Sequence, residues 1–255
     1  MTPRTAAPAR GIPIALTIGG SDSGGGAGIQ ADLKTFTALA VHGCSAISCV
    51  TAQNTLGVTR VDGLPPAALS AQIDAVLSDL AVGALKTGML LNQPLIEATA
   101  AAIAPLALPK LIDPVMVSRA GAVLLEATAI DAYRQLLLPQ AELLTPNLHE
   151  ARLLSGLPIA GATGVERAAE RLLALGPAAV LIKGGGLAEL RGRDFLRTAA
   201  AGHRRMLQPA ARGLALEAAV IAAKTYVEGA LRQALAIGAG QGPLSRRASC
   251  RLGVS

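Results

Sequence analysis

The chain has 255 residues, of which 51% are hydrophobic and only 2% are aromatic. This length fits one α/β domain with a core that needs no disulfide, and the scarcity of aromatic rings argues against base-stacking nucleic-acid modules. The net charge of +6 comes from two segments rich in arginine, with Arg191, Arg193, Arg197, Arg204, Arg205 and Arg212 in one and Arg246, Arg247 and Arg251 in the other. Outside these segments acidic residues slightly outnumber basic ones, so we expect no nucleic-acid surface on the main body.

Taken in chain order, the sequence predicts a disordered N-terminal tail at residues 1–11, one domain at residues 12–243 and a disordered basic tail at residues 244–255. The stretch from Thr35 to Thr59 lacks Lys, Arg, Asp and Glu, but it contains His42, amides, hydroxyls and two glycines. We therefore expect no membrane-spanning helix there.

The three cysteines have neither a disulfide nor a metal-site spacing. Cys44 and Cys49 fall in an apolar, strand-like run and are expected in the core, whereas Cys250 lies near the end of the sequence. This cysteine usage is typical of a protein in the reducing cytoplasm.

Strand-like and helix-like runs alternate from residue 12 onwards. Strands are expected at Ile12–Ile18, Ser45–Val50, Val58–Val61, Ala84–Thr87, Glu142–Thr145 and Ala179–Lys183, and a further strand is expected to end at residues 111–114. Helices are expected from Ile29 to Phe36, at Ala67–Leu80, Pro94–Ile103 and Ala127–Leu138, from Asn147, at Val165–Leu175 and at Leu214–Ile237. The alternation predicts an α/β fold, with a mostly parallel central sheet and helices on both faces.

A glycine-rich run, Gly19 to Gly28, joins the first strand to the first helix. Such a run lets a small polar ligand approach bare backbone N–H groups at a helix start. Residues 26–31 also fit the dinucleotide pattern G-x-G-x-x-A, but that pattern needs an acidic residue about 20 positions later for the ribose. Residues 43–53 contain none, which argues against a nicotinamide cofactor.

Polar side chains recur where the predicted strands end, and in open α/β sheets ligands bind at that edge. These residues are Asp22, Gln53, Asn54, Lys86, Thr87, Asp113, Thr145, Asn147 and Lys183. Asn147 and Glu150 have the spacing of a helix-capping box, and Glu150 has the alternative role of orienting water on Mg²⁺. Lys183 either holds a phosphate or is a solvated strand-end lysine.

Taken together, these residues resemble the hydroxymethylpyrimidine and phosphomethylpyrimidine kinases of thiamine synthesis, in the ribokinase-like superfamily. The matching stretches are residues 16–36, 50–55, 86–89, 113–116, 145–151 and 181–185, and a further block at 213–243 is similar to the family's last helices. The resemblance implies a ribokinase-like fold and transfer of the γ-phosphoryl group of ATP to a pyrimidine hydroxymethyl group and then to its monophosphate.

The resemblance also implies roles for individual residues. Gln53 corresponds to the residue that hydrogen-bonds the aminopyrimidine, and the residues around it are Gly20, Asp32, Met89 and Val115. Asn147 and Lys183 are implied nucleotide contacts, and Glu150 and Asp113 are implied Mg²⁺ residues. The partners expected are the pyrimidine and ATP, without nucleic acid or membrane, and the superfamily often forms homodimers.

The chain departs from the family between residues 197 and 213. The family has two more strands and a Gly-Thr-Gly-Cys-like loop there, which supplies its anion hole and a cysteine base, whereas this segment has no glycine pair, acid or cysteine. Two explanations of this segment are open. One is an out-of-frame or deleted stretch of the gene, which we favour, and the other is a natural basic loop. The catalytic residue is therefore unassigned, the sheet is expected to be truncated at one part, and slow turnover is expected.

Two alternatives to an active pyrimidine kinase follow. One is a pyridoxal-type kinase, because related folds phosphorylate hydroxymethyl groups on similar rings. The other is a catalytically silent pyrimidine-binding protein that has kept the substrate pocket and lost the phosphoryl-transfer residues.

Overall fold

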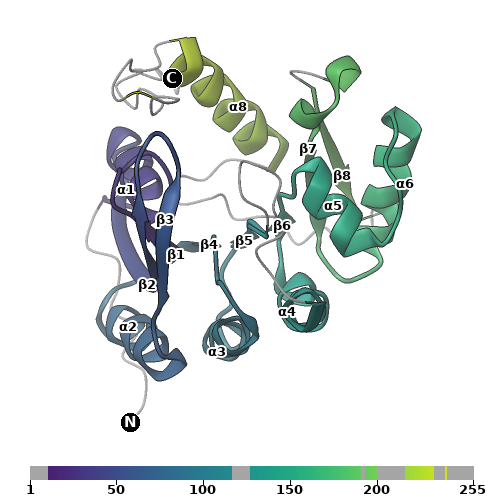
Figure 1. Ribbon diagram of the computed structural model, residues 1–255. Helices are drawn as coiled ribbons and strands as arrows, with labels where there is room; N and C mark the ends of the chain where they lie inside the picture. The colour runs from purple at the N-terminus through teal and green to yellow at the C-terminus, as the bar shows by residue number, and fades with distance from the viewer. Residues whose placement is uncertain (1–10, 117–126, 191–192, 200–215, 233–238, 240–255) are drawn as a thin grey trace. The chain divides into compact units, whose positions relative to one another are not determined.

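The computed structural model describes residues 11–116, 127–190, 193–199, 216–232 and 239. Along these residues strands alternate with helices, as the sequence predicts (Figure 1). The described strands form a mostly parallel sheet of eight, in the hydrogen-bonding order β3-β2-β1-β4-β5-β6-β7-β8. The chain divides into two compact units, residues 1–85 with 206–255 and residues 86–205.

The first unit contains the glycine-rich run. Strand β2 pairs in parallel with β1 and antiparallel with β3, while α1 packs on β1 and β2 and α2 packs on β2. The bounds are β1 Ile14–Asp22, α1 Gly28–Ala38, β2 His42–Gln53, β3 Val58–Gly63 and α2 Pro66–Asp79, followed by the start of β4, Ala84–Thr87. Helix α8, Leu216–Arg232, belongs to the same unit.

Aliphatic side chains at strand and helix spacing form the core of this unit. Leu16 and Ile18 alternate along β1, and Leu69 and Ile73 lie one turn apart on α2, all fully buried. Cys44 and Cys49 are also buried in β2, which confirms their predicted place, and burial raises the pKa of both thiols.

The second unit carries the remaining strands. Strands β5, β6 and β7 pair in parallel, and β8 pairs antiparallel with β7. The bounds are α3 Gln93–Ile103, β5 Lys110–Ile112, α4 Ala127–Ala132, β6 Leu143–Leu144, α5 Leu148–Ser155, α6 Ala162–Leu173, β7 Ala179–Lys183 and β8 Asp194–Thr198. Helices α3 and α4 lie side by side, and α5 and α6 pack together (Figure 1).

Local sequence signals explain where the helices of this unit begin and end. Asn92 caps α3 by accepting a hydrogen bond from the N–H of Leu95, and α5 ends at Gly156, whose φ of 71° is left-handed. On α6, Val165, Ala168 and Leu172 recur every three to four residues and are buried, so this helix presents an apolar face to its neighbours.

Strand β8 was not predicted, and three other elements differ from the sequence-based predictions. Strand β1 continues through Gly19, Gly20 and Ser21 to Asp22, because these residues pair with β2 across a register shift. The predicted helix at Ala127–Leu138 is an α-helix only to Ala132 and continues as the π-helical turn η1, Tyr133–Leu137, and the 3₁₀ turn η2, Leu138–Gln140. On α8 the aromatic side chain of Tyr226 is buried, and the sequence analysis did not single it out.

Some predictions fall on residues outside the described ranges. The two tails do so almost entirely, and of the atypical segment 197–213 only residues 197–199 are described, the first two of them at the end of β8. The expected loss of two strands therefore stays a prediction, as does the single domain at 12–243. Among the described residues, no helix is long and apolar enough to cross a membrane.

Candidate active site

The four neighbouring strands β4 to β7 have their carboxyl ends in the second unit, where they bring polar side chains together. The backbone N–H of Asp113 donates to Thr87 O at 3.1 Å, and that of Thr145 donates to Ile112 O at 3.0 Å. The N–H of Lys183 donates to Pro146 O at 2.9 Å. Because the strands run in parallel, the residues after their carboxyl ends share one edge of the sheet, as the sequence predicts.

An ion pair between Lys183 and Asp113 lies at the centre of this edge. Lys183 Nζ donates to Asp113 Oδ1 at 3.0 Å, and the hydroxyl of Thr145 donates to the same oxygen at 3.2 Å. The side chain of Asp113 is 20% exposed, and that of Lys183 is 43% exposed. The ammonium group can therefore reach a ligand while it neutralises the carboxylate.

Burial and charge act in opposite directions on this pair. Burial alone would raise the pKa of Asp113, but the charges of Lys183 and Lys86 and two hydrogen bonds hold it below its usual value. Burial alone would lower the pKa of Lys183, but the charges of Asp113 and Glu150 raise it above its usual value. Both groups are charged at neutral pH.

Asn147 and Glu150 form the predicted capping box at the start of α5. The Asn147 side chain accepts from the N–H groups of His149 at 2.8 Å and Glu150 at 2.9 Å, and Glu150 Oε2 accepts from the N–H of Asn147 at 2.8 Å. Glu150 is only 3% exposed. Burial raises the pKa of its carboxyl, against the attraction of Lys183 and the hydrogen bond from Asn147.

Tyr133 is part of this cluster, and sequence reasoning missed it. Its hydroxyl donates to Gly88 O at 3.3 Å in the interior, and burial together with the charges of Asp113 and Glu150 raises its pKa. Its position on η1 belongs to no sequence motif. The chain has only two tyrosines, and this scarcity was the one feature of the sequence that could have drawn attention to Tyr133. Lys86 was noted at a strand end but was given no role, and here its charge acts on Asp113.

In the first unit, the glycine-rich loop wraps around the carboxylate of Asp22. The N–H groups of Gly24, Gly26 and Ala27 donate to its two oxygens at 2.8–2.9 Å. The expectation of bare N–H groups is therefore wrong for these three donors, because the chain's own carboxylate occupies the concave backbone that an anion would otherwise fill.

Gly28 begins α1 where the helix touches β1. Its φ is +57°, and a Cβ atom on Gly28 would collide with the carbonyl oxygen of Gly20. A side chain is therefore excluded by conformation and by space. Gly20 lies on β1 as a backbone contact of this helix start.

Gln53 ends β2 and is held by the loop. The hydroxyl of Ser23 donates to Gln53 O at 2.7 Å and accepts from Gln53 N at 2.8 Å. The hydroxyl of Thr51 donates to Gln53 Oε1 at 3.1 Å, which orients the side-chain amide. Among the described residues, the amide nitrogen of Gln53 has no hydrogen-bond partner and is available to a ligand.

The other predicted substrate residues are distributed over both units. Asp32 lies on α1, where its carboxylate accepts a hydrogen bond from the buried Thr17 hydroxyl at 2.7 Å. Met89 follows β4, and Val115 follows β5 through a tight turn in which its N–H donates to Asp113 O at 2.9 Å. Both are half-buried and belong to the second unit. The substrate roles of these residues stay predictions.

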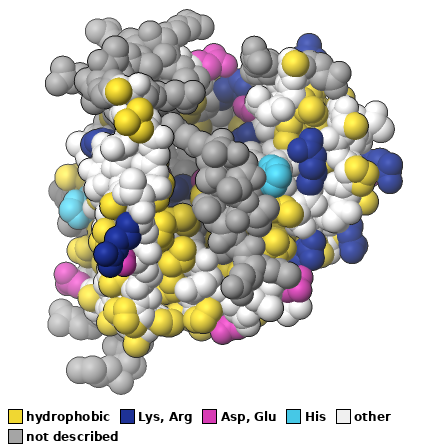
Figure 2. Space-filling model, viewed as in Figure 1, with side chains coloured by type: hydrophobic (Ala, Val, Ile, Leu, Met, Phe, Trp, Pro, Cys, Tyr) yellow, Lys and Arg dark blue, Asp and Glu magenta, His cyan; other side chains and the backbone are white. Residues whose placement is uncertain are grey.

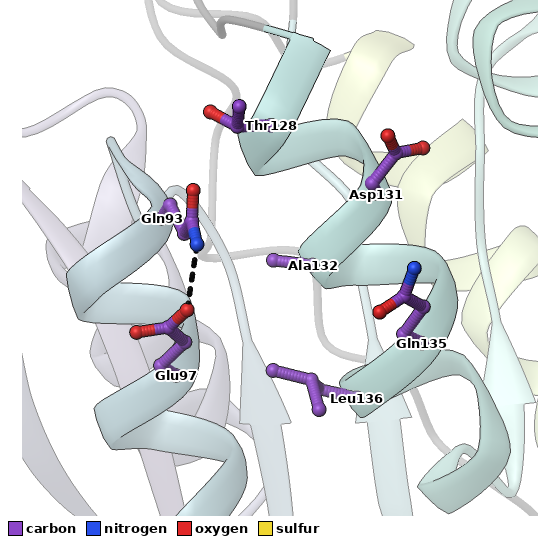
Figure 3. Close-up of a pocket in the computed structure, with 7 residues that line it drawn as sticks. All are labelled: Gln93, Glu97, Thr128, Asp131, Ala132, Gln135 and Leu136. Atoms are coloured by element: carbon purple, nitrogen blue, oxygen red, sulfur yellow. Dashed lines mark hydrogen bonds between the residues drawn. The ribbon is translucent and has the colours of Figure 1, made fainter.

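A shallow cavity of about 230 Å³ lies elsewhere, between α3 and α4 (Figure 3). It is lined by Gln93, Glu97, Thr128, Asp131, Ala132, Gln135 and Leu136. The amide of Gln93 donates to Glu97 Oε1 at 2.7 Å across one wall. None of the predicted site residues lines this cavity, so it is not the candidate active site.

Comparison with known proteins places these residues in a family. Residues 22–209 match the family model described as phosphomethylpyrimidine kinase. The chain is 55% identical over 254 residues to the hydroxymethylpyrimidine/phosphomethylpyrimidine kinase of Synechococcus elongatus, covering 91% of this chain and 97% of that protein.

Solved structures give the same result for the fold. The chain is similar to the phosphomethylpyrimidine kinase of Clostridium difficile, with a TM-score of 0.77, 37% identity, and coverage of 86% of this chain and 99% of that one. It is also similar to the pyridoxal kinase of Staphylococcus aureus in complex with pyridoxal, with a TM-score of 0.82, 28% identity, and coverage of 95% and 96%. The predicted ribokinase-like α/β fold is confirmed.

Proposed function

We propose that this chain, which belongs to the phosphomethylpyrimidine kinase family, transfers the γ-phosphoryl group of ATP to 4-amino-5-hydroxymethyl-2-methylpyrimidine and then to its monophosphate. The observation that carries the proposal is the Lys183–Asp113 pair at the ends of four adjacent strands, inside the segment that matches the family. In the first transfer the hydroxymethyl oxygen attacks the γ-phosphorus, the bond to ADP breaks, and the hydroxyl proton passes to solvent. In the second transfer an ionised phosphate oxygen of the monophosphate attacks the γ-phosphorus and the bond to ADP breaks.

Lys183 is proposed to bind the transferring phosphates. Its ammonium is charged at neutral pH and partly exposed, so it can move from Asp113 to a phosphate oxygen without being desolvated anew. Phosphoryl transfer depends mainly on positioning and on stabilising charge at the phosphate oxygens. Lys183 at the sheet edge can supply both positioning and charge stabilisation. Asn147 is its neighbour, because the two residues form an isolated parallel β-bridge.

Asp113 and Glu150 are proposed to hold Mg²⁺. Within the described residues no three acidic, histidine or cysteine side chains are grouped to enclose a metal. Two carboxylates close enough to influence each other's ionisation nevertheless suit Mg²⁺, which keeps most of its waters and shares substrate phosphates. When bound, the ion would neutralise phosphate charge. Glu150 Oε2 already caps α5, so its part in this site would be through water.

Gln53 is proposed to recognise the aminopyrimidine. Gly20 and Asp32 of the first unit, and Met89 and Val115 of the second, are further proposed substrate residues. Thr51 fixes the Gln53 amide so that its nitrogen can donate to a ring nitrogen. We infer a cytoplasmic setting from the two buried free thiols, Cys44 and Cys49. A homodimer is also proposed.

A pyridoxal-type kinase is the second candidate, because the fold matches a pyridoxal kinase with its substrate bound. Purified protein of verified mass should release ADP when the pyrimidine is added and much less ADP when pyridoxal is added. The reverse preference would assign the second candidate. Calorimetric binding of the pyrimidine with no ADP release from either ring would identify a silent binding protein.

A further inference from the structure

Residues 88–91 follow β4 and lead to the cap of α3, and they include Met89, one of the proposed substrate residues. Within this β4–α3 segment, Leu91 has a φ of 66°, in the left-handed region that leucine rarely adopts. A strained residue of this kind persists only where the surrounding structure fixes the backbone. The contacts that hold the β4–α3 segment therefore decide where Met89 lies.

Backbone hydrogen bonds fix both ends of the β4–α3 segment. Before it, Thr87 O accepts from the N–H of Asp113 at 3.1 Å, which ties the end of β4 to the residue that pairs with the lysine. After it, the N–H of Asn92 donates to Leu90 O at 2.8 Å, and the Asn92 side chain caps α3. The side chain of Leu90 is fully buried. Between these ends, the carbonyl of Gly88 is held by a side chain instead.

That side chain is Tyr133, which is fully buried and whose hydroxyl donates to Gly88 O at 3.3 Å. Burial and the charges of Asp113 and Glu150 raise the pKa of the phenol, so the hydroxyl stays protonated and remains a donor. The peptide that joins Gly88 to Met89 is planar. Holding its carbonyl oxygen therefore also fixes the direction in which the backbone enters Met89.

Tyr133 begins the π-helical turn η1, and the next residue anchors this turn to α5. Arg134 Nε donates to Leu154 O at 2.9 Å, and a second guanidinium nitrogen donates to Leu153 O. Other basic side chains lie at the surface over α5 and α6 (Figure 2), whereas Arg134 uses its guanidinium to hold carbonyls of α5. Rare π-helical turns often occur at functional sites. The turn η1 is thus a fixed support from which Tyr133 reaches the β4–α3 segment.

We propose that Tyr133 is a positioning residue for the pyrimidine, because its hydroxyl holds Gly88 and thereby sets where Met89 lies against the ring. The inference rests on the proposed function, which assigns Met89 to the pyrimidine site. Tyr133 is fully buried, so it acts through the backbone of the β4–α3 segment and not by touching substrate. Loss of its hydroxyl should therefore weaken binding of the pyrimidine and leave Mg·ATP binding unchanged.

Hydrogen exchange of Tyr133→Phe tests this contact without any ligand. Phenylalanine keeps the buried ring and removes only the hydroxyl. The N–H of Asn92, which is bonded to Leu90 O, should exchange about fivefold faster, the equivalent of one ordinary hydrogen bond. The N–H of Ala104, at the other end of α3, should keep the rate of the parent, which separates local loosening from general destabilisation. Tyr226→Phe, the same change at the chain's other tyrosine, which is also buried, is the matched control and should alter neither rate.

Calorimetry measures what the contact contributes to substrate binding. Tyr133→Phe should bind the pyrimidine about fivefold more weakly than the parent and Mg·ATP equally well. The difference should be the same below and above neutral pH, because the phenol does not titrate there. In any active preparation the KM for the pyrimidine should rise with kcat nearly unchanged, and Tyr226→Phe should match the parent.

Three results would overturn the inference alone: an unchanged exchange rate at Asn92, faster exchange with unchanged pyrimidine affinity, or equal weakening of both ligands. A parent chain that binds no pyrimidine would overturn the proposed function, and with it the substrate role of Tyr133. The exchange rates would in that case still show whether the Tyr133 hydroxyl holds the β4–α3 segment, so the two failures are distinguishable.

Discussion

Lys183 and Asp113, seventy residues apart in sequence, join through a 3.0 Å contact between Nζ and Oδ1 at the carboxyl ends of β7 and β5. The pair keeps a cation at the sheet edge that the proposed phosphates would approach. Each member also sets the protonation state of the other.

Replacing Lys183 by methionine should abolish measurable ATP binding. It should also destabilise the fold at neutral pH by about 1–2 kcal/mol. This value is smaller than that for breaking a fully buried pair, because Lys183 is partly exposed. Asp113 has a lowered pKa in the folded chain, so its contribution is present above the unfolded pKa and is lost as the pH falls through the folded one. Lys183 has a raised pKa, so its contribution is lost only in strong base. Denaturant titrations should therefore show a loss at pH 7 that shrinks towards acid, and Lys183→Arg should retain most of the stability. A loss independent of pH would contradict the ion pair.

Replacing Glu150 by glutamine separates its two proposed roles. Glutamine preserves the capping box, so thermal stability should be retained, while water-mediated binding of Mg²⁺ and therefore of Mg·ATP should weaken. Because burial raises the pKa of Glu150, its ionisation costs stability as the pH rises through that value. The variant should thus become relatively more stable than the parent with increasing pH. Equal Mg·ATP affinity in both proteins would leave Glu150 as a capping residue alone.

Gln53→Ala should weaken pyrimidine binding by about 1–3 kcal/mol, because the ring would lose its paired hydrogen bonds. Isothermal calorimetry with the pyrimidine alone measures this without requiring turnover. Asn54→Ala, at the next position along the chain, serves as the neighbouring control. Unchanged affinity of Gln53→Ala would remove Gln53 from the substrate site.

Ser23→Ala tests whether the loop positions Gln53. Ser23 makes two hydrogen bonds to the Gln53 backbone and is itself exposed, so its loss should cost little global stability. Any active preparation should show a raised KM for the pyrimidine with kcat nearly unchanged, and calorimetry should show the same loss of affinity. Ser23→Thr, which keeps the hydroxyl, should recover affinity. A fall in kcat at constant KM would contradict a positioning role.

Turnover by the chain as written should be slower than that of the Synechococcus elongatus relative by a factor on the order of 10²–10³, the typical cost of losing one anion-hole donor. Cys44 and Cys49 cannot replace the missing cysteine, since both are buried and burial raises their pKa. Pyrimidine-dependent ADP release from the two purified proteins, side by side, measures the difference. A turnover number on the order of 1 s⁻¹ would show that residues 197–213 rebuild the site.

Much of the local structure could be predicted from the sequence because its causes are local. The bounds of β4 and β7 follow from short apolar runs, and the cap of α5 follows from Asn147 and Glu150 three residues apart. The alternation of strands and helices predicts the parallel sheet, and a parallel sheet places Asp113 and Lys183 at one edge.

Other features depended on contacts between distant segments. The glycine-rich loop closes on Asp22 and does not present bare N–H groups to a ligand. This arrangement depends on the extension of β1 by its pairing with β2. The burial of Tyr133, whose hydroxyl donates to Gly88 O, likewise arises from packing between distant segments. Periodicity in the sequence identifies an element and its apolar face. The partners and the pKa of a side chain depend instead on which groups the fold brings within a few ångströms of it, so only the tertiary structure decided them.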